Sequence, residues 1–211
     1  RQSLGDERSV GESLNNVGFA YYQLGEFDNA QTYWQQSAAT FAGIDDRAGA
    51  VHAQQSLALA EIARGDWPTA RQLLSESQRT AESLQMAEER AISLATLADL
   101  NRLEGRIGEA LSNTSTAMAE FQRRSDPRGV VEMQLMQVAI AADLGDWAVA
   151  REALSALSSD EVQEQATVLS WRRAAVLLGS GELAPALDAA DSAIEQAANA
   201  RSYAAELQAR L

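Results

Sequence analysis

Apolar side chains recur along this chain at intervals of three and four residues, the spacing that places them on one face of an α-helix. The first helical face carries Leu14, Val17, Ala20, Tyr21 and Leu24, and the next carries Phe27, Ala30, Tyr33, Trp34 and Phe41. Runs of about 16–18 residues with this periodicity lie on both sides of five similarly placed glycines. The pattern therefore predicts pairs of helices joined by short turns.

Each turn repeats the pattern Gly-x-aromatic/aliphatic-x-x-Ala. The five copies begin at Gly25, Gly65, Gly105, Gly145 and Gly181, and successive glycines are separated by 40, 40, 40 and 36 residues. A fixed period in this range is typical of a repeat array, in which each helical hairpin stacks on the next and extends one continuous core. The sequence therefore predicts an all-α fold and favours an interaction surface over an active site.

The residues around the glycines suit a turn between helices. Glycine after the last helical residue readily takes the left-handed conformation that ends a helix. The acidic residue that follows, such as Asp66, can cap the next helix, whereas Arg106 cannot. All three prolines lie at the start of a predicted helix: Pro68, Pro127 and Pro185. Proline is tolerated in the first turn of a helix, so these positions support the predicted boundaries.

The boundaries divide residues 6–199 into one array of five units. The units span 6–45, 46–85, 86–125, 126–161 and 162–199. Residues 200–211 begin a further terminal helix, which we expect to be truncated. The chain begins with Arg1 and ends within this helical pattern, so we expect a segment of a longer protein.

The first unit resembles the tetratricopeptide repeat, whose pattern runs W-x2-L-G-x2-Y…A-x3-F. Six positions carry the resemblance: Leu14 stands at the Trp position, Val17 at Leu, Gly18 at Gly, Tyr21 at Tyr, Ala30 at Ala and Trp34 at Phe. The resemblance extends over essentially the whole chain. It implies a right-handed superhelical solenoid of about five helical hairpins. The usual period is 34 residues, so this chain looks like a long-period variant similar to bacterial signalling and regulator arrays.

The fifth unit is ambiguous in register. A strict alignment places Arg173 at a core position, and burial of an unpaired guanidinium is costly. A shift of one residue makes Trp171, Ala174 and Leu178 the buried stripe and ends the helix at Gly179. We expect the shifted register.

The resemblance also implies a concave groove lined by the first helix of each unit, where family members hold a peptide or a partner's helix. Its positions here are Asn15, Phe19, Tyr22, His52, Gln55, Leu59, Ile62, Asp99, Arg102 and Leu135. Five of them are apolar or aromatic. They are either exposed, and then suited to an amphipathic helix or hydrophobic peptide, or packed on neighbouring units. Arg102 is the only basic one, which disfavours a C-terminal carboxylate ligand.

Charge and composition limit the classes of partner that this chain can bind. With 17 basic and 30 acidic residues the formal net charge is −13, so nucleic acid and anionic membrane surfaces are poor direct partners. The chain has no cysteine, which excludes thiolate nucleophiles and zinc–thiolate sites. No run approaches 18 apolar residues. We expect a cytoplasmic protein whose partner is a protein or peptide, and the sequence leaves its oligomeric state open.

Catalytic chemistry finds no support in the sequence. His52 is the only histidine, and neither an H-E-x-x-H nor a G-x-S-x-G motif is present. The acidic pairs at 45–46 and 88–89 lie at predicted helix starts, where they complement the helix dipole. We therefore expect no enzyme, metal or cofactor. The expected function is a protein- or peptide-binding scaffold. The alternative is a ligand-sensing or autoinhibitory array of a multidomain bacterial signalling or transcription regulator.

Overall fold

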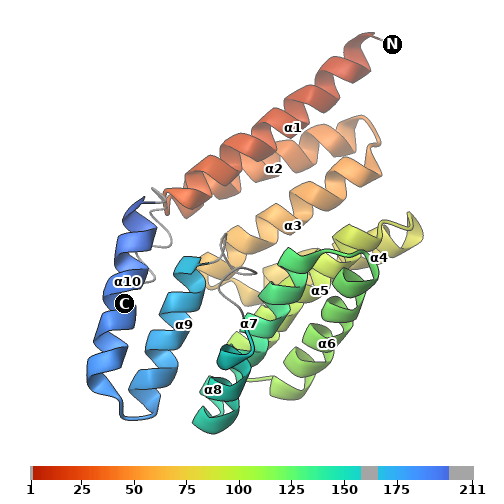
Figure 1. Cartoon of the computed structure of the whole chain (residues 1–211). Coiled ribbons are helices and arrows are strands. Elements are labelled where there is room, and N and C mark those ends of the chain that lie inside the picture. The colour runs from red at the N-terminus through yellow and green to blue at the C-terminus, as the bar shows by residue number, and fades with distance from the viewer. Residues whose placement is uncertain (1, 158–165, 200–211) are drawn as a thin grey trace. The chain divides into compact units, whose positions relative to one another are not determined.

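A computed structural model describes residues 2–157 and 166–199, and these residues form ten α-helices and no strand (Figure 1). The helices are α1 (Gln2–Gln23), α2 (Phe27–Gly43), α3 (Arg47–Arg64), α4 (Trp67–Ser83), α5 (Ala87–Leu103), α6 (Ile107–Arg123), α7 (Pro127–Asp143), α8 (Trp147–Ser155), α9 (Ala166–Gly179) and α10 (Leu183–Asn199). The predicted all-α fold is confirmed. The proposed terminal helix at 200–211 lies outside the described residues.

The chain forms two compact units, Arg1–Glu104 and Gly105–Leu211. In the first unit each helix packs against the next, and α3 also contacts both α1 and α5. The three first helices α1, α3 and α5 therefore form one layer, and α2 and α4 form a second. In the second unit the contacts run from α6 to α7, from α7 to α8 and α9, and from α9 to α8 and α10.

The turn glycines adopt the predicted conformation. Their φ angles are 76° at Gly25, 80° at Gly65, 74° at Gly105, 72° at Gly145 and 83° at Gly181. The left-handed residue turns the chain so that the following amide bonds back to the helix. The Asp66 amide, for example, donates to the Glu61 carbonyl at 2.9 Å. These bonds satisfy helix-end carbonyls that would otherwise lack a partner.

The shifted register expected for the fifth unit is wrong. The left-handed residue is Gly181, and the Glu182 amide donates to the Leu177 carbonyl at 2.9 Å, as in the other turns. Leu178 is 59% exposed, whereas Ala174 is buried. Arg173 lies on the exposed side of α9. The strict register therefore leaves Arg173 exposed, which removes the physical reason for the shift.

A second set of turns, between hairpins, was missed in the sequence because it uses no glycine. Asp45, Gln85 and Ser125 have φ angles of 56°, 57° and 55°. Successive members are 40 residues apart, so these turns follow the same period as the glycine turns. Left-handed conformation costs an L-residue about 1–2 kcal/mol, and three turns of the array carry that cost.

Helix capping follows the predicted pattern in part. Four aspartates accept a hydrogen bond from a backbone amide three residues ahead: Asp46, Asp66, Asp126 and Asp146. Glu26 makes no such bond, and its carboxylate instead accepts from Asn29 Nδ2 at 2.6 Å. Arg106 also provides no side-chain cap, as expected, and pairs with Glu109. A shorter aspartate therefore caps these helices where glutamate does not.

The core is built where each second helix meets the first helix of the next hairpin. Ala30 and Trp34 of α2 pack with Leu57 and Ala60 of α3. Ala70 and Leu74 of α4 pack with Leu97 and Leu100 of α5 in the same way. The turn-motif alanines, predicted to lie at close helix crossings, are all buried: Ala30, Ala70, Ala110, Ala150 and Ala186. Burial of these small side chains lets neighbouring helices approach closely.

Candidate functional site

The predicted groove positions fall on the first helices, and in the first unit they come from α1, α3 and α5. Their exposure differs. Phe19 is 52% exposed, an unusual environment for a phenylalanine on a helix surface. Tyr22, Leu59 and Ile62 are half-buried. Only some of the five apolar or aromatic groove positions are therefore open to a partner.

Tyr22 is held by its neighbours on the first hairpin. Its ring centroid lies 5.4 Å from that of Phe27 and 5.6 Å from that of Trp34, both in tilted arrangements. Burial raises the pKa of Tyr22, and the negative charge of Asp99 raises it further. Asp99 lies on α5, so this electrostatic effect acts between two predicted groove residues of different first helices.

Asp99 and Arg102 form an ion pair within α5. The Arg102 guanidinium donates from Nε and Nη2 to Asp99 Oδ1 at 3.1 and 3.0 Å. The Arg102 side chain is 14% exposed and that of Asp99 38%. Most of the guanidinium is therefore covered, while the carboxylate remains accessible.

Two residues of α3 bind α5. His52 Nε2 lies 3.6 Å from Glu89 Oε1, and the histidine side chain is half exposed. Gln55 is buried, and its Nε2 donates to the Glu89 carbonyl at 2.6 Å and to Ser93 Oγ at 2.9 Å. His52 is positioned for an outside partner, whereas the Gln55 amide is used to join the two helices.

Leu135 lies in the second unit and is 4% exposed. It belongs to a cluster with Val131, Val138, Leu154 and Val176. Leu135 is not open to a partner, because it packs in the core between α7, α8 and α9. Of the two interpretations left open by the sequence, packing applies here and exposure applies to Phe19.

Asn15 differs from the other groove positions because its backbone carbonyl is hydrogen-bonded whereas its side-chain oxygen is not. Its backbone carbonyl accepts a hydrogen bond from Trp34 Nε1 at 2.9 Å, which fixes the buried indole. Its side-chain Oδ1 is buried and finds no donor within the described part of the chain. A buried acceptor without a partner is costly, so this side chain lowers the stability of the first hairpin.

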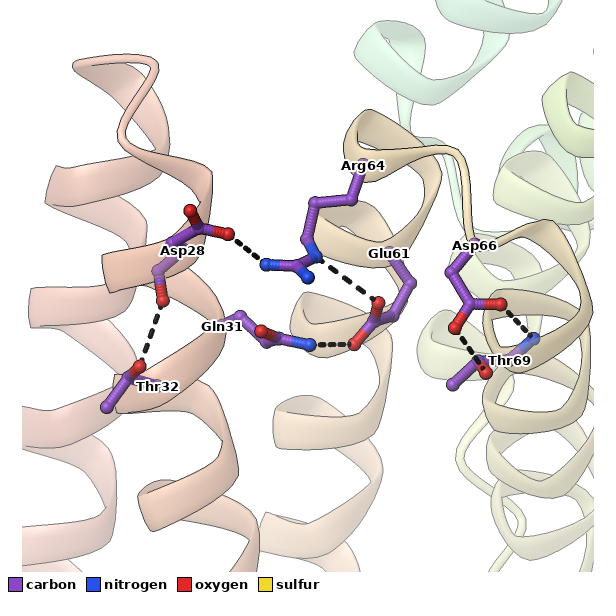
Figure 2. A network of polar contacts seen from close by, with 7 residues as sticks. All are labelled: Asp28, Gln31, Thr32, Glu61, Arg64, Asp66 and Thr69. Carbon is purple, nitrogen blue, oxygen red and sulfur yellow. Dashed lines mark hydrogen bonds and ion pairs between the residues drawn. The ribbon is translucent and has the colours of Figure 1, made fainter.

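A polar network joins the first two hairpins beside these positions, and the sequence did not reveal it. Figure 2 shows Arg64 at the end of α3 with its guanidinium between Asp28 at the start of α2 and Glu61 of α3. Glu61 is 4% exposed; Gln31 Nε2 donates to its carboxylate at 2.6 Å, and Arg64 Nε lies 3.8 Å from it. The network ties α2 to α3.

The same link recurs one repeat later. Arg71 on α4 donates to Asn101 Oδ1 on α5 at 2.7 Å, and it also pairs with Glu104. Gln31 and Arg71 are each six residues after a turn glycine, and Glu61 and Asn101 are each four residues before the next one. The 40-residue offset is a signal that could have identified both pairs in the sequence.

Other kinds of site find little support. Within the described residues no three His, Asp or Glu side chains gather closely enough to hold a metal ion. The same residues contain no helix that is both long and apolar enough to span a bilayer. The arrangement offers apolar contacts and fixed hydrogen-bonding groups.

Comparison with known proteins supports the same family. The tetratricopeptide repeat family model matches residues 9–83. No curated protein matches the sequence. Among solved structures, a Rap protein complexed with competence and sporulation factor is 18% identical, with a TM-score of 0.77 over 97% of this chain. This chain spans 62% of the length of that Rap protein.

The match to two further solved structures extends over nearly their whole length. A thermophilic TPR protein of Thermus thermophilus is 20% identical, with a TM-score of 0.61 over 93% of this chain and 99% of its own. A putative kinesin light chain of Podosopora anserina with TPR-like repeats is 19% identical, with a TM-score of 0.60 over 93% and 99%. At these identities the likeness concerns the fold. Residues 9–83 therefore carry tetratricopeptide repeats, and the chain has the fold of tetratricopeptide-type repeat proteins.

Proposed function

We propose that the chain is a protein- or peptide-binding module, and that the partner lies across α1, α3 and α5 of the first unit. The observation that carries the proposal is Phe19 on α1, whose side chain is 52% exposed. The half-exposed His52 of α3 and Asp99 of α5 lie on the same set of helices. This combination of apolar and polar groups suits an amphipathic segment.

The chemistry of these residues defines the partner. Phe19 and the half-buried Leu59 and Ile62 offer an apolar surface for an aliphatic or aromatic side chain. The accessible Asp99 carboxylate accepts hydrogen bonds, so the partner supplies N–H or O–H donors. Because helices of a packed array are already ordered, little conformational entropy is lost in forming the site.

Selection of peptides by the whole chain tests the proposal. Peptides from a random phage-displayed library would be selected on the protein, and their affinities measured by fluorescence anisotropy. We expect Phe19→Ala and His52→Ala each to weaken binding by about tenfold or more, since a few central residues dominate most interfaces. Val149→Ala removes an equally exposed apolar side chain from the second unit and should bind normally. Equal affinity in all three variants would reject this site.

A second candidate is a ligand-sensing or autoinhibitory array within a larger bacterial regulator. Its support is the fold likeness to the Rap protein, whose structure contains competence and sporulation factor and of which this chain spans 62%. In that case the occupant of α1, α3 and α5 is a small effector or another domain of the same protein. Selected peptides that compete with a flanking domain for the chain would favour this function over an independent scaffold.

A further inference from the structure

One row of equivalent positions crosses the three first helices of the first unit. Phe19 on α1, Leu59 on α3 and Asp99 on α5 are separated by 40 residues each. Because α3 contacts both α1 and α5, and equivalent positions of stacked repeats lie side by side, these residues follow one another across the helices. The row therefore runs from an exposed aromatic ring through a half-buried aliphatic side chain to a carboxylate.

The carboxylate of Asp99 has one oxygen in use and one free. Both hydrogen bonds from Arg102, at 3.1 and 3.0 Å, end on Oδ1. Oδ2 accepts no hydrogen bond from the residues that the structure describes. A carboxylate has about four lone-pair sites on its two oxygens, so Asp99 can bind a further donor while Arg102 holds it in place. Its side chain is 38% exposed, so a partner can supply that donor.

The accessible charge at this end of the row is negative. The Arg102 side chain is only 14% exposed, less than half as much as that of Asp99. Burial and, next, the charge of Asp99 raise the pKa of Tyr22, so this charge is felt as far as α1. The whole chain carries a net charge of −13. A cationic group of a partner is therefore attracted to Asp99.

The middle of the row is apolar. Leu59 and, one turn further along α3, Ile62 are both half-buried. Lysine and arginine side chains lay their aliphatic stem on apolar surface and keep the charged group at its end. Such a side chain can follow the surface of Leu59 with its charge at Asp99, whereas an acidic side chain would be repelled.

We propose that the partner is a basic peptide, an extended segment in which a lysine or arginine lies over Leu59 and binds Asp99 Oδ2 while an apolar residue packs on Phe19. This inference rests on the binding site proposed above and adds the charge of its ligand. Packed helices lie about 8–10 Å apart, so α1 and α5 are separated by about 16–20 Å. An extended chain advances about 3.3 Å per residue, so the two anchoring residues are about five or six positions apart in the peptide.

Peptides selected from the random library on the unmodified chain are the probes. We expect them to share a basic and an apolar residue at this spacing. The tightest binder is resynthesised with norleucine in place of the basic residue, which keeps an aliphatic stem and removes the charge. Fluorescence anisotropy then gives the affinity of both peptides for the unmodified chain, for Asp99→Asn and for Glu76→Gln, at low and at physiological ionic strength.

Asp99→Asn should weaken binding of the basic peptide by about tenfold or more and leave binding of the norleucine peptide unchanged. Unchanged binding of the norleucine peptide also shows that this variant is folded. Glu76→Gln removes the same charge from an exposed position of α4 and should leave both affinities unchanged. Salt screens the attraction between exposed charges, so higher ionic strength should weaken binding of the basic peptide alone.

Failure of this inference differs from failure of the binding site. If binding depends on Phe19 but the selected peptides carry no basic residue, the site binds peptides and the preference for a basic one is wrong. The same conclusion follows if Asp99→Asn changes the two affinities by the same factor. If Phe19→Ala binds the basic peptide as tightly as the unmodified chain does, the site itself is rejected, and the preference for a basic peptide with it.

Discussion

Gln31 on α2 donates a hydrogen bond from Nε2 to Oε1 of Glu61 on α3 at 2.6 Å, and this contact joins two successive hairpins through a buried carboxylate (Figure 2). Each hairpin of a repeat array contacts mainly its neighbours, so such links contribute directly to the stability of the interface between repeats. Their effect can be measured one side chain at a time.

Replacement of Gln31 by alanine should lower the free energy of unfolding by about 1–3 kcal/mol, because it leaves a buried carboxylate with one hydrogen-bond donor fewer. Urea unfolding followed by circular dichroism gives the value. Gln72→Ala, at an exposed position of α4, is the matched control and should change stability little. If the two variants are equally stable, the bond to Glu61 contributes nothing to the interface.

Replacement of Gly49 by alanine should destabilise the first unit. A Cβ at this position would lie 2.2 Å from Cδ1 of the Phe41 ring, which is buried. Overpacking costs about 1–3 kcal/mol, while the higher helix propensity of alanine returns at most about 1 kcal/mol. Thermal unfolding should show a lower Tm, and Phe41→Leu in the same chain should restore part of it.

Gly43→Ala is the control for that substitution, since a Cβ there meets no atom within 4 Å. It should leave Tm unchanged or raise it. A Gly49→Ala variant as stable as Gly43→Ala would show that the aromatic ring moves aside without cost.

Replacement of Gln85 by glycine should stabilise the chain. Gln85 has a φ of 57°, and relief of left-handed strain is worth about 1–2 kcal/mol against a glycine entropy cost of about 0.5–1 kcal/mol. We expect a net gain of up to about 1 kcal/mol in urea unfolding. Gln72→Gly in the middle of α4 should instead lose about 0.5–1 kcal/mol. Destabilisation in both variants would contradict the assigned turn.

Because of Tyr22, the free energy of unfolding should decrease as the pH rises above about 10. Burial and the charge of Asp99 raise its pKa above the ordinary value of 10.0. An unfolded chain ionises this phenol at lower pH than the folded chain, so the unfolded state binds fewer protons above about pH 10 and stability falls there. Below that pH both states are protonated and the contribution is constant.

Ultraviolet titration of the phenol and urea unfolding between neutral and alkaline pH measure this effect. Tyr22→Phe should lose the part of the alkaline decline due to this group. Asp99→Asn should lower the pKa of Tyr22 only in part, because burial is the larger cause. An unchanged titration in Asp99→Asn would place Asp99 too far from Tyr22 to share a site.

The glycine turns could be predicted from the sequence, whereas the turns between hairpins could not. Glycine at Gly65 and aspartate at Asp66 are local signals, and the structure uses both as predicted. The left-handed Gln85 has no such signal, because a non-glycine residue takes this conformation only when the packed helices on both sides impose it. The register of the fifth unit failed for a related reason: the exposure of Arg173 depends on which face of α9 packs.

The groove positions show the same limit. Their place on the first helices was implied by the family resemblance, but their exposure was not. Phe19 is open, Gln55 is bound to α5 and Leu135 is part of a core, although all three occupy positions that the family pattern treats alike. Exposure depends on what each neighbouring helix places opposite a residue, and that neighbour lies on a different hairpin of the array.

By itself the sequence determined the helices, the glycine turns and the 40-residue period, because each depends on residues close together in the chain or on their regular spacing. Only the tertiary structure decided the contacts between hairpins: the carboxylate of Glu61 under Gln31, the amide of Gln55 on Ser93, and the Arg71 side chain on α5. These depend on the distance between side chains on different helices, which hydrophobic periodicity along one helix does not specify.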